Sequence, residues 1–170
     1  IKKCKTKFAI YSDIDVNFKK NLIKNLIKFS KKIKDFSVIV PNHGKIKSKK
    51  NYIRNFVGES AFMFYNLKKI RKIGFFDERF FLYYEEIDLL YRCKKNNLNV
   101  YLIPSLSIKH DRASSMDENI NKITYLRSWH YMWSMFYFYK KNYSFLFGIK
   151  KTYIYLIKDL IMFLYYLLLF

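Results

Sequence analysis

The hydrophobic and polar positions at the start of the chain predict a strand, a helix and a second strand. An apolar run at 8–11 is typical of a buried strand and leads into an acidic turn at 12–15. Over 18–33, apolar residues recur every three or four positions between lysines and asparagines, which predicts an amphipathic helix of about four turns. The apolar run at 36–40, stopped by Pro41, predicts the next strand. This order is that of a βαβ unit, whose strands run parallel.

Two further helices are predicted in the middle of the chain. Asn66 stands where its side chain can cap a short helix over 67–73, which Gly74 closes. The other helix follows an aromatic and acidic stretch at 75–86. Its predicted buried face consists of Ile87, Leu90 and Tyr91.

The last third of the chain changes from strands to helices. Apolar runs at 100–104 and 107–110 predict two short strands, the first stopped by a proline. The pattern over 119–139 is helical and strongly aromatic, and 153–170 is apolar except for one lysine and one aspartate. Eleven uninterrupted apolar residues follow that aspartate, fewer than the ~20 that a membrane span needs. We interpret this segment as an interfacial or packed helix, or as the front of a longer span.

The composition is that of a folded protein with a substantial core. Of 170 residues, 51% are hydrophobic and 21% aromatic, which excludes a disordered chain. The chain begins with Ile and ends in a bare apolar run, so we expect it to be cut at both ends. We predict an α/β region at 1–115 and a helical, membrane-associated tail at 116–170. Cys4 and Cys93 have neither zinc-site nor disulfide spacing, which indicates a reducing cytosolic compartment.

The formal net charge of +20 indicates an anionic partner. The lysines are scattered through every segment and do not form one stripe with interleaved aromatic residues, the pattern on which single-stranded nucleic acids stack. A membrane surface or a polyanionic small ligand is therefore favoured over nucleic acid. A nucleic-acid-binding module would show steeply salt-dependent binding to RNA or DNA.

Acidic residues crowd the start of the second middle helix. Glu85, Glu86 and Asp88 lie within four positions, directly after a run of bulky aromatic residues. Neighbouring carboxylates repel one another, so such a cluster indicates a base or a cation site. The alternative is a solvated helix start, where negative charge favours the positive end of the helix dipole. Asp88 also stands four residues before Arg92, the spacing of an ion pair along a helix, so a structural role is open for it.

A second acidic pair, Asp13 and Asp15, follows the first predicted strand. Sheets of the α/β class place ligands at the carboxyl ends of strands. Oxygen ligands at this spacing suit Mg²⁺ or Mn²⁺, which can bridge the phosphates of a nucleotide. An aspartate-rich turn or a helix cap is the alternative. His110 is either a hydrogen-bonded structural residue or a ligand, and His43 and His130 are interpreted as structural.

Four motifs follow one another in a specific order. They are Asp-Ile-Asp, then Gly-Glu-Ser-Ala-Phe-Met, then Gly-Phe-Phe-Asp-Glu-Arg-Phe-Phe-Leu-Tyr-Tyr-Glu-Glu-Ile-Asp-Leu-Leu-Tyr-Arg, then Ile-Pro and Lys-His with a nearby Ser. In this order they resemble family 2 glycosyltransferases, and more narrowly the rhamnosyltransferase-like members that build bacterial surface polysaccharides. The resemblance runs over 8–115, and the aromatic stretch at 129–137 is similar to the helical tail of some members.

The resemblance implies a GT-A fold, with a partial mixed sheet flanked by helices, and inverting sugar transfer. The donor would be a nucleotide-diphosphate sugar, UDP- or dTDP-linked, and the acceptor a hydroxyl of a glycan or a lipid-linked glycan. Asp13 and Asp15 fall on the family's metal motif, and His110 on the histidine that can complete the metal site. A bound Mn²⁺ or Mg²⁺ would neutralise charge on the departing diphosphate.

The resemblance also implies that Glu86 is the catalytic base. Glu85-Glu86 falls on the family's Glu-Asp pair, whose second member is the base. Glutamate is one methylene longer than aspartate, so its carboxylate must be set back to reach the acceptor hydroxyl. We expect Glu86 to deprotonate the acceptor while Glu85 or Asp88 positions it.

A larger departure from the family is the absence of the chain that precedes the metal motif and grips the nucleotide base. Alone, this chain is expected to be poorly stable and inactive, with unpaired sheet edges. We expect it to act at the cytoplasmic face of the inner or plasma membrane, with no nucleic-acid partner. The alternative is a truncated, non-catalytic transferase-like protein that binds a membrane or another protein.

Overall fold

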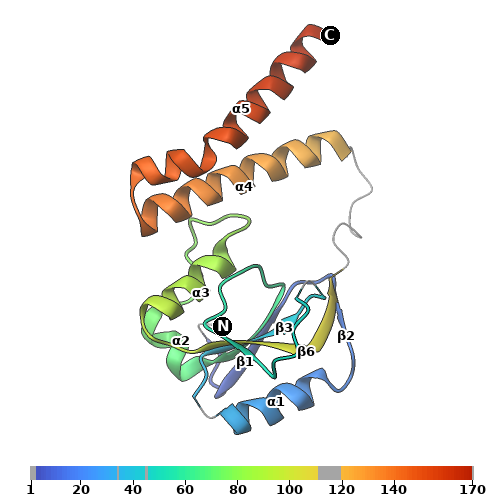
Figure 1. Cartoon of the computed structure of the whole chain (residues 1–170), viewed down its shortest axis with the longest axis vertical. Coiled ribbons are helices and arrows are strands. Elements are labelled where there is room, and N and C mark those ends of the chain that lie inside the picture. The colour runs from blue at the N-terminus through green and yellow to red at the C-terminus, as the bar shows by residue number, and fades with distance from the viewer. Residues whose placement is uncertain (1–2, 34, 45, 111–119, 170) are drawn as a thin grey trace. The chain divides into compact units, whose positions relative to one another are not determined.

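The described chain divides into two compact units (Figure 1). The computed structural model describes all residues except 1–2, 34, 45, 111–119 and 170. One unit comprises Ile1–Phe76 with Glu86–Met116, and the other Asp77–Glu85 with Asp117–Phe170. The predicted boundary at 115 and the serines that follow His110 lie outside the described residues.

The first unit contains a mixed six-stranded sheet. Its strands are β1 Phe8–Ser12, β2 Val16–Phe18, β3 Val38–Asn42, β4 Ile53–Arg54, β5 Phe62–Asn66 and β6 Val100–His110. The order is β1-β5-β3-β6-β2, and β4 also pairs with β6. Only β3 and β6 pair in parallel in the described sheet. The predicted α/β class with a mixed sheet is confirmed, but β5 lies between the parallel strands β1 and β3 of the predicted βαβ unit.

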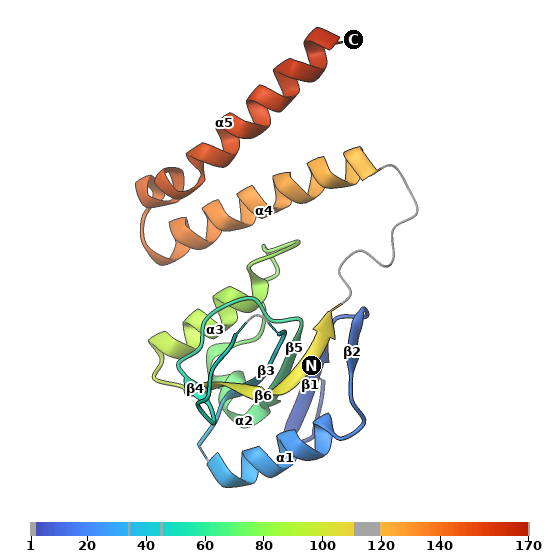
Figure 2. The same cartoon turned by 45° about the vertical axis from the view of Figure 1, so that its right-hand side comes forward.

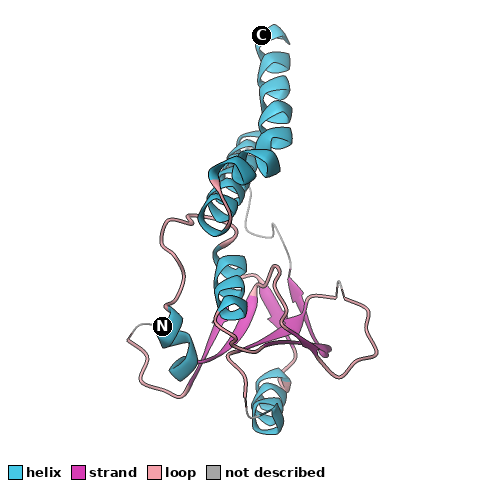
Figure 3. Ribbon diagram, turned by 60° about the vertical axis from the view of Figure 1, so that its left-hand side comes forward, coloured by secondary structure: helices cyan, strands magenta, loops and turns pink. Residues whose placement is uncertain are grey.

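Helices cover both faces of this sheet (Figure 3). They are α1 Leu22–Ile33, α2 Leu67–Ile73 and α3 Glu85–Lys95. Successive side chains of the central strands alternate between two cores, as strand geometry requires. The core beneath α2 and α3 receives Val38, Val40, Met63, Tyr65, Val100 and Leu102. The core beneath α1 receives Ile39, Phe62, Phe64, Tyr101 and Ile103.

Two prolines lie inside strands, which corrects the prediction that they end them. Pro41 belongs to β3 and Pro104 to β6, so 100–104 and 107–110 form one strand. The β3–β6 register shifts between Pro41 and Asn42, and prolines are tolerated at such an irregularity because no ladder N–H is needed there. At this register shift the Asn42 side chain of β3 connects the two strands by donating to the Pro104 carbonyl of β6 at 3.4 Å.

The starts of two helices also differ from the prediction. Phe18 lies in β2, so α1 begins only at Leu22. The Asn66 side chain makes no capping hydrogen bond to α2, and its amide nitrogen donates to the Phe36 carbonyl at 3.2 Å. Gly74 ends α2 as predicted, with a φ of 79° that favours glycine.

The helix α3 buries Leu90 as predicted, but the rest of its buried face differs from the prediction. Ile87 and Tyr91 are only half-buried. Asp88, a charged residue, is fully buried because Arg92 neutralises it. The apolar residues that α3 contributes to the core are Leu89, Leu90 and Cys93.

The second unit contains the helices α4 Ile120–Asn142 and α5 Phe145–Leu169. They pack through aromatic pairs such as Tyr131 with Tyr155, whose ring centroids are 5.7 Å apart. At Gly148 the helices approach so closely that a Cβ atom would lie 3.1 Å from the Phe136 carbonyl oxygen. Both predicted tail helices are present, and α5 begins eight residues earlier than predicted, at 145 instead of 153. Within the described ranges, no helix has the length and apolarity that crossing a membrane requires.

Candidate metal site

The pairing of β2 with β6 brings His110 beside the acidic turn after β1. Val16 lies opposite His110 in the register, so Asp15 reaches the imidazole. His110 Nε2 is 3.0 Å from Asp15 Oδ1 and 3.9 Å from Asp13 Oδ2. One ligand atom from each of the three residues lies within 4.8 Å of the other two, so the cluster could hold a metal ion. The three residues proposed as ligands from the sequence therefore lie together.

Hydrogen bonds from neighbouring strands orient Asp13. The Tyr11 hydroxyl donates to Asp13 Oδ1 at 2.6 Å. The Asp13 backbone N–H donates to the Ala61 carbonyl at 2.9 Å, which fixes the turn against the end of β5. Asp13 Oδ2 is the oxygen that faces His110. One oxygen is thus occupied by a phenol and the other is directed into the cluster.

Among the described residues, the basic neighbour of the two aspartates is a histidine, His110. Within the described part of the chain, no lysine or arginine forms an ion pair with Asp13 or Asp15. The side chains remain accessible, at 34% for Asp13, 18% for Asp15 and 17% for His110. Two carboxylates and one imidazole are a donor set that Mn²⁺ accepts, and Mg²⁺ accepts the carboxylates.

A cavity of about 210 Å³ lies next to this cluster. His43 lines the cavity, and its ring packs edge-on against the His110 ring, with centroids 6.2 Å apart. The lining combines polar with apolar side chains, which are Asn42, His43 and Glu59, and Ile46, Phe56 and Leu102. The sequence interpretation gives His43 a structural role and does not single out Glu59. His43 follows β3 directly, and the pairing of β3 with β6 brings it to His110.

Glu86 stands in the first turn of α3, half-buried and with its Oε2 atom shielded from solvent. Burial raises the pKa of the Tyr65 hydroxyl well above its usual range, and Tyr11, Cys93, Glu86 and Asp13 raise it further. Glu86 and Asp13 both belong to the first unit.

We do not include Asp88 in the candidate site, because it forms a structural ion pair with Arg92. Its side chain is 0% exposed, and its Oδ2 accepts a hydrogen bond from Arg92 Nε at 2.8 Å. Arg92 also donates to the carbonyls of Ile73 at 2.8 Å and Gly74 at 3.2 Å, just beyond α2. The ion pair predicted from the i,i+4 spacing is confirmed. It favours the structural role of Asp88 over a catalytic one.

Glu85 belongs to the second unit, together with the loop that precedes it. In this loop Tyr83 and Tyr84 have φ angles of 67° and 68°, a left-handed conformation that is unfavourable for bulky residues. The Ser134 hydroxyl of α4 donates to the Leu82 carbonyl at 2.7 Å, which holds the loop in place. Such strain persists where surrounding contacts enforce it and is frequent at functional sites.

No protein-family model matches the chain, and no curated protein is significantly similar to it. What the fold and the site define is a mixed α/β protein with a candidate divalent-cation site.

Proposed function

We propose that this chain is the metal-binding and acceptor-activating part of an inverting glycosyltransferase of the GT-A type, similar to family 2. The observation that carries the proposal is the cluster of Asp13, Asp15 and His110 at the carboxyl end of β1. Within the described residues its two carboxylates have His110 as a partner but no lysine or arginine, so a metal cation would supply counter-charge here. The motif order of the sequence supports the same class.

The donor in this proposal is a nucleotide-diphosphate sugar, with UDP and dTDP as the candidate nucleotides. A divalent cation bound here would supply Lewis-acid stabilisation of the departing diphosphate. The chain's own residues prepare that site: Tyr11 holds Asp13 through one oxygen, and the β2–β6 pairing fixes His110 beside Asp15. Preorganised ligands reduce the reorganisation that binding requires.

Glu86 is the proposed base. It takes the proton of the acceptor hydroxyl as the acceptor oxygen forms its bond to the anomeric carbon and the bond from that carbon to the diphosphate breaks. Glu85, its neighbour in α3, is retained as a positioning residue. Asp88 is not, because its charge is neutralised by Arg92.

The cavity lined by His43 and Glu59 supports a sugar as the ligand. Sugar rings present apolar C–H faces and hydroxyl groups, and this lining offers both kinds of contact. The edge-on contact between His43 and His110 joins the cavity to the metal ligands. We assign it to the sugar that lies next to the diphosphate.

Calorimetric titration of an active preparation that contains this chain, with UDP and with dTDP, tests this function. Binding is expected in Mn²⁺ and not in EDTA, and it should disappear in Asp15→Ala. Glu86→Gln should bind the nucleotide as the parent chain does, because the base does not touch the nucleotide. Nucleotide binding that is the same with and without metal, or in Asp15→Ala, would refute the proposal and favour a non-catalytic protein.

The base is tested separately, in an active preparation that contains this chain. Glu86→Gln should lower sugar transfer by about 100-fold or more while the nucleotide affinity is retained. Glu78→Gln, which removes a carboxylate from the exposed loop before α3, is the matched control and should retain transfer. Unchanged turnover in Glu86→Gln would remove the base assignment without affecting the metal site.

A further inference from the structure

The C-terminal half of α5 exposes apolar side chains on every side of the helix. Their exposed fractions range from 37% for Met162 to 86% for Leu168. Consecutive residues of an α-helix point 100° apart, so an unbroken exposed run surrounds the helix axis. The run consists of Leu160, Ile161, Met162, Phe163, Leu164 and Tyr165, and continues with Leu167 and Leu168.

The contacts between α4 and α5 involve the other half of α5. Phe145 packs against Phe136 of α4 with centroids 5.7 Å apart, and the Ser128 hydroxyl of α4 donates to Asp159 at 3.0 Å. Toward its C-terminus, α5 diverges from α4 in both views (Figures 1 and 2). A protein partner covers one stripe of a helix, whereas lipid chains cover its whole circumference. The exposure around α5 therefore fits lipid better than a protein groove.

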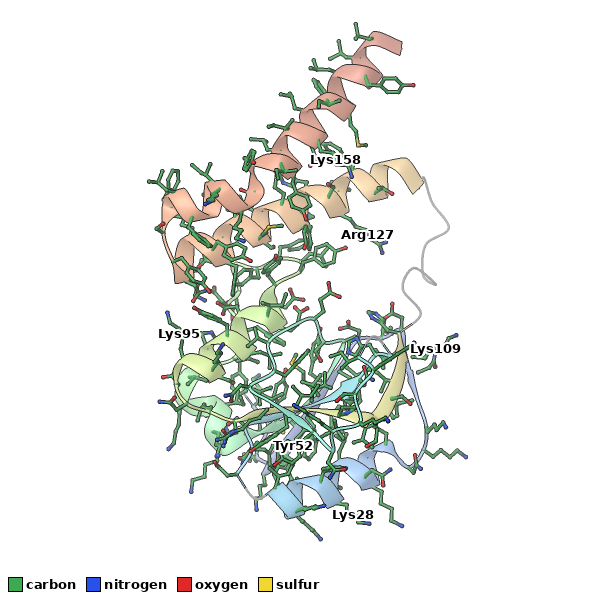
Figure 4. The ribbon with its side chains drawn as sticks, in the orientation of Figure 1. Lys28, Tyr52, Lys95, Lys109, Arg127 and Lys158 are labelled. Carbon is green, nitrogen blue, oxygen red and sulfur yellow. The ribbon has the colours of Figure 1, made fainter. Side chains whose placement is uncertain are left out.

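Basic and aromatic residues lie near the start of this run. Lys158 is exposed two residues before it (Figure 4), with Asp159 between them, and α5 carries three lysines against one aspartate. Trp129 of α4, next to the residue that contacts Asp159, is 48% exposed. Tryptophan and lysine are typical of the boundary between water and lipid, where lysine pairs with anionic headgroups.

We propose that the C-terminal half of α5 enters a membrane with an anionic surface. The described residues from Leu160 to Leu169 form about 15 Å of helix. In this proposal Lys158 and Trp129 lie near the lipid headgroups. This attachment needs neither the metal nor a nucleotide, so it stands independently of the proposed function.

Flotation of the full chain with vesicles tests the proposal. The chain, synthesised in the presence of vesicles of phosphatidylcholine and phosphatidylglycerol, is expected to float with them. Leu164→Lys combined with Leu168→Lys should lower the bound fraction about tenfold or more, since charge is unfavourable in hydrocarbon. The matched control is Ile23→Lys with Ile27→Lys on α1, where both isoleucines are 40% exposed, and it should float as the parent chain does. Vesicles of phosphatidylcholine alone should bind less, because the lysines lose their anionic partners.

Three outcomes would overturn the proposal. The first is a parent chain that stays in the lipid-free fraction. The second is an α5 variant that floats as well as the α1 control. The third is a lipid-independent dimer that the α5 variant, and not the control, converts to a monomer, because α5 would then be covered by a second copy. Circular dichroism of both variants shows whether each is folded.

Discussion

Two carboxylate sites, one in each unit, differ in their partners. In the second unit Asp77 accepts hydrogen bonds from Arg79 Nε at 3.0 Å, Lys141 Nζ at 2.9 Å and the Tyr137 hydroxyl at 3.1 Å. In the first unit Asp13 and Asp15 have a phenol and an imidazole, and no lysine or arginine within the described residues. The counter-charges of Asp77 are therefore Arg79 and Lys141 of the same unit.

This difference separates a structural carboxylate from a candidate ligand. Burial raises the pKa of Asp77, but the hydrogen bonds from Arg79, Lys141 and Tyr137 outweigh it and hold that pKa far below its ordinary range. These bonds also attach the loop 77–84 to α4. Whether acidic residues close together in a sequence are structural or are candidate metal ligands can therefore be decided only when their cationic partners are known.

The largest loss of stability is expected at Asp88. Asp88→Asn leaves the Arg92 guanidinium partly buried without its carboxylate, and breaking one side of a buried pair costs about 3–5 kcal/mol. The free energy of unfolding in urea measures this loss. A loss below about 1 kcal/mol would contradict the structural role and reopen the catalytic one.

A smaller loss is expected when Asp77 loses its charge. Asp77→Asn weakens several charge-assisted hydrogen bonds at once, so about 1–3 kcal/mol of unfolding free energy should disappear. Glu78→Gln, the same change at the exposed neighbour, should stay within about 0.5 kcal/mol of the parent chain. Equal losses in the two variants would show that the Asp77 contacts contribute nothing specific.

The contribution of Asp77 should depend on pH. Its pKa is lowered in the folded protein, so its stabilisation is complete above the ordinary carboxyl pKa of about 4. It is lost as the pH falls below that value toward the lower folded pKa. The difference in unfolding free energy between the parent chain and Asp77→Asn should therefore narrow between about pH 5 and pH 3. A difference that stays constant over this range would contradict the assignment.

The smallest effect is expected at an exposed ion pair. Lys69 donates to Asp35, whose side chain is 67% exposed, and this hydrogen bond lowers the pKa of Asp35. Water screens such pairs, so Lys69→Met should cost less than about 1 kcal/mol of unfolding free energy. Lys68→Met, at the adjacent exposed position, is the control. A loss as large as that of Asp77→Asn would show that solvent exposure does not separate the two classes of ion pair.

Local patterns are sufficient to predict several elements and the two aspartates of the candidate site. The apolar runs located β1, β3 and the first part of β6, and the i,i+4 spacing identified the pair of Asp88 and Arg92. The two aspartates lie one residue apart after a strand, so their closeness required no tertiary information. His110 was placed with them by resemblance, and the β2–β6 pairing is what brings it there.

Features that depend on pairing between distant strands could not be predicted. The contact between His43 and His110 requires β3 and β6 to be neighbours, which no local pattern specifies. The prolines were interpreted as strand ends because the register shift that tolerates them exists only in the paired sheet. The left-handed Tyr83 and Tyr84 likewise depend on contacts of their loop with α4.

The most direct test of the central claim is calorimetric titration of Mn²⁺ alone into three proteins: the parent chain, Asp15→Asn and Asp77→Asn. The claim is that Asp13, Asp15 and His110 bind a metal cation, whereas Arg79 and Lys141 already neutralise Asp77. The parent chain and Asp77→Asn should bind Mn²⁺ with the same affinity, and Asp15→Asn about 100-fold more weakly or not at all. Absence of binding in the parent chain, or equal affinity in Asp15→Asn, would contradict the account.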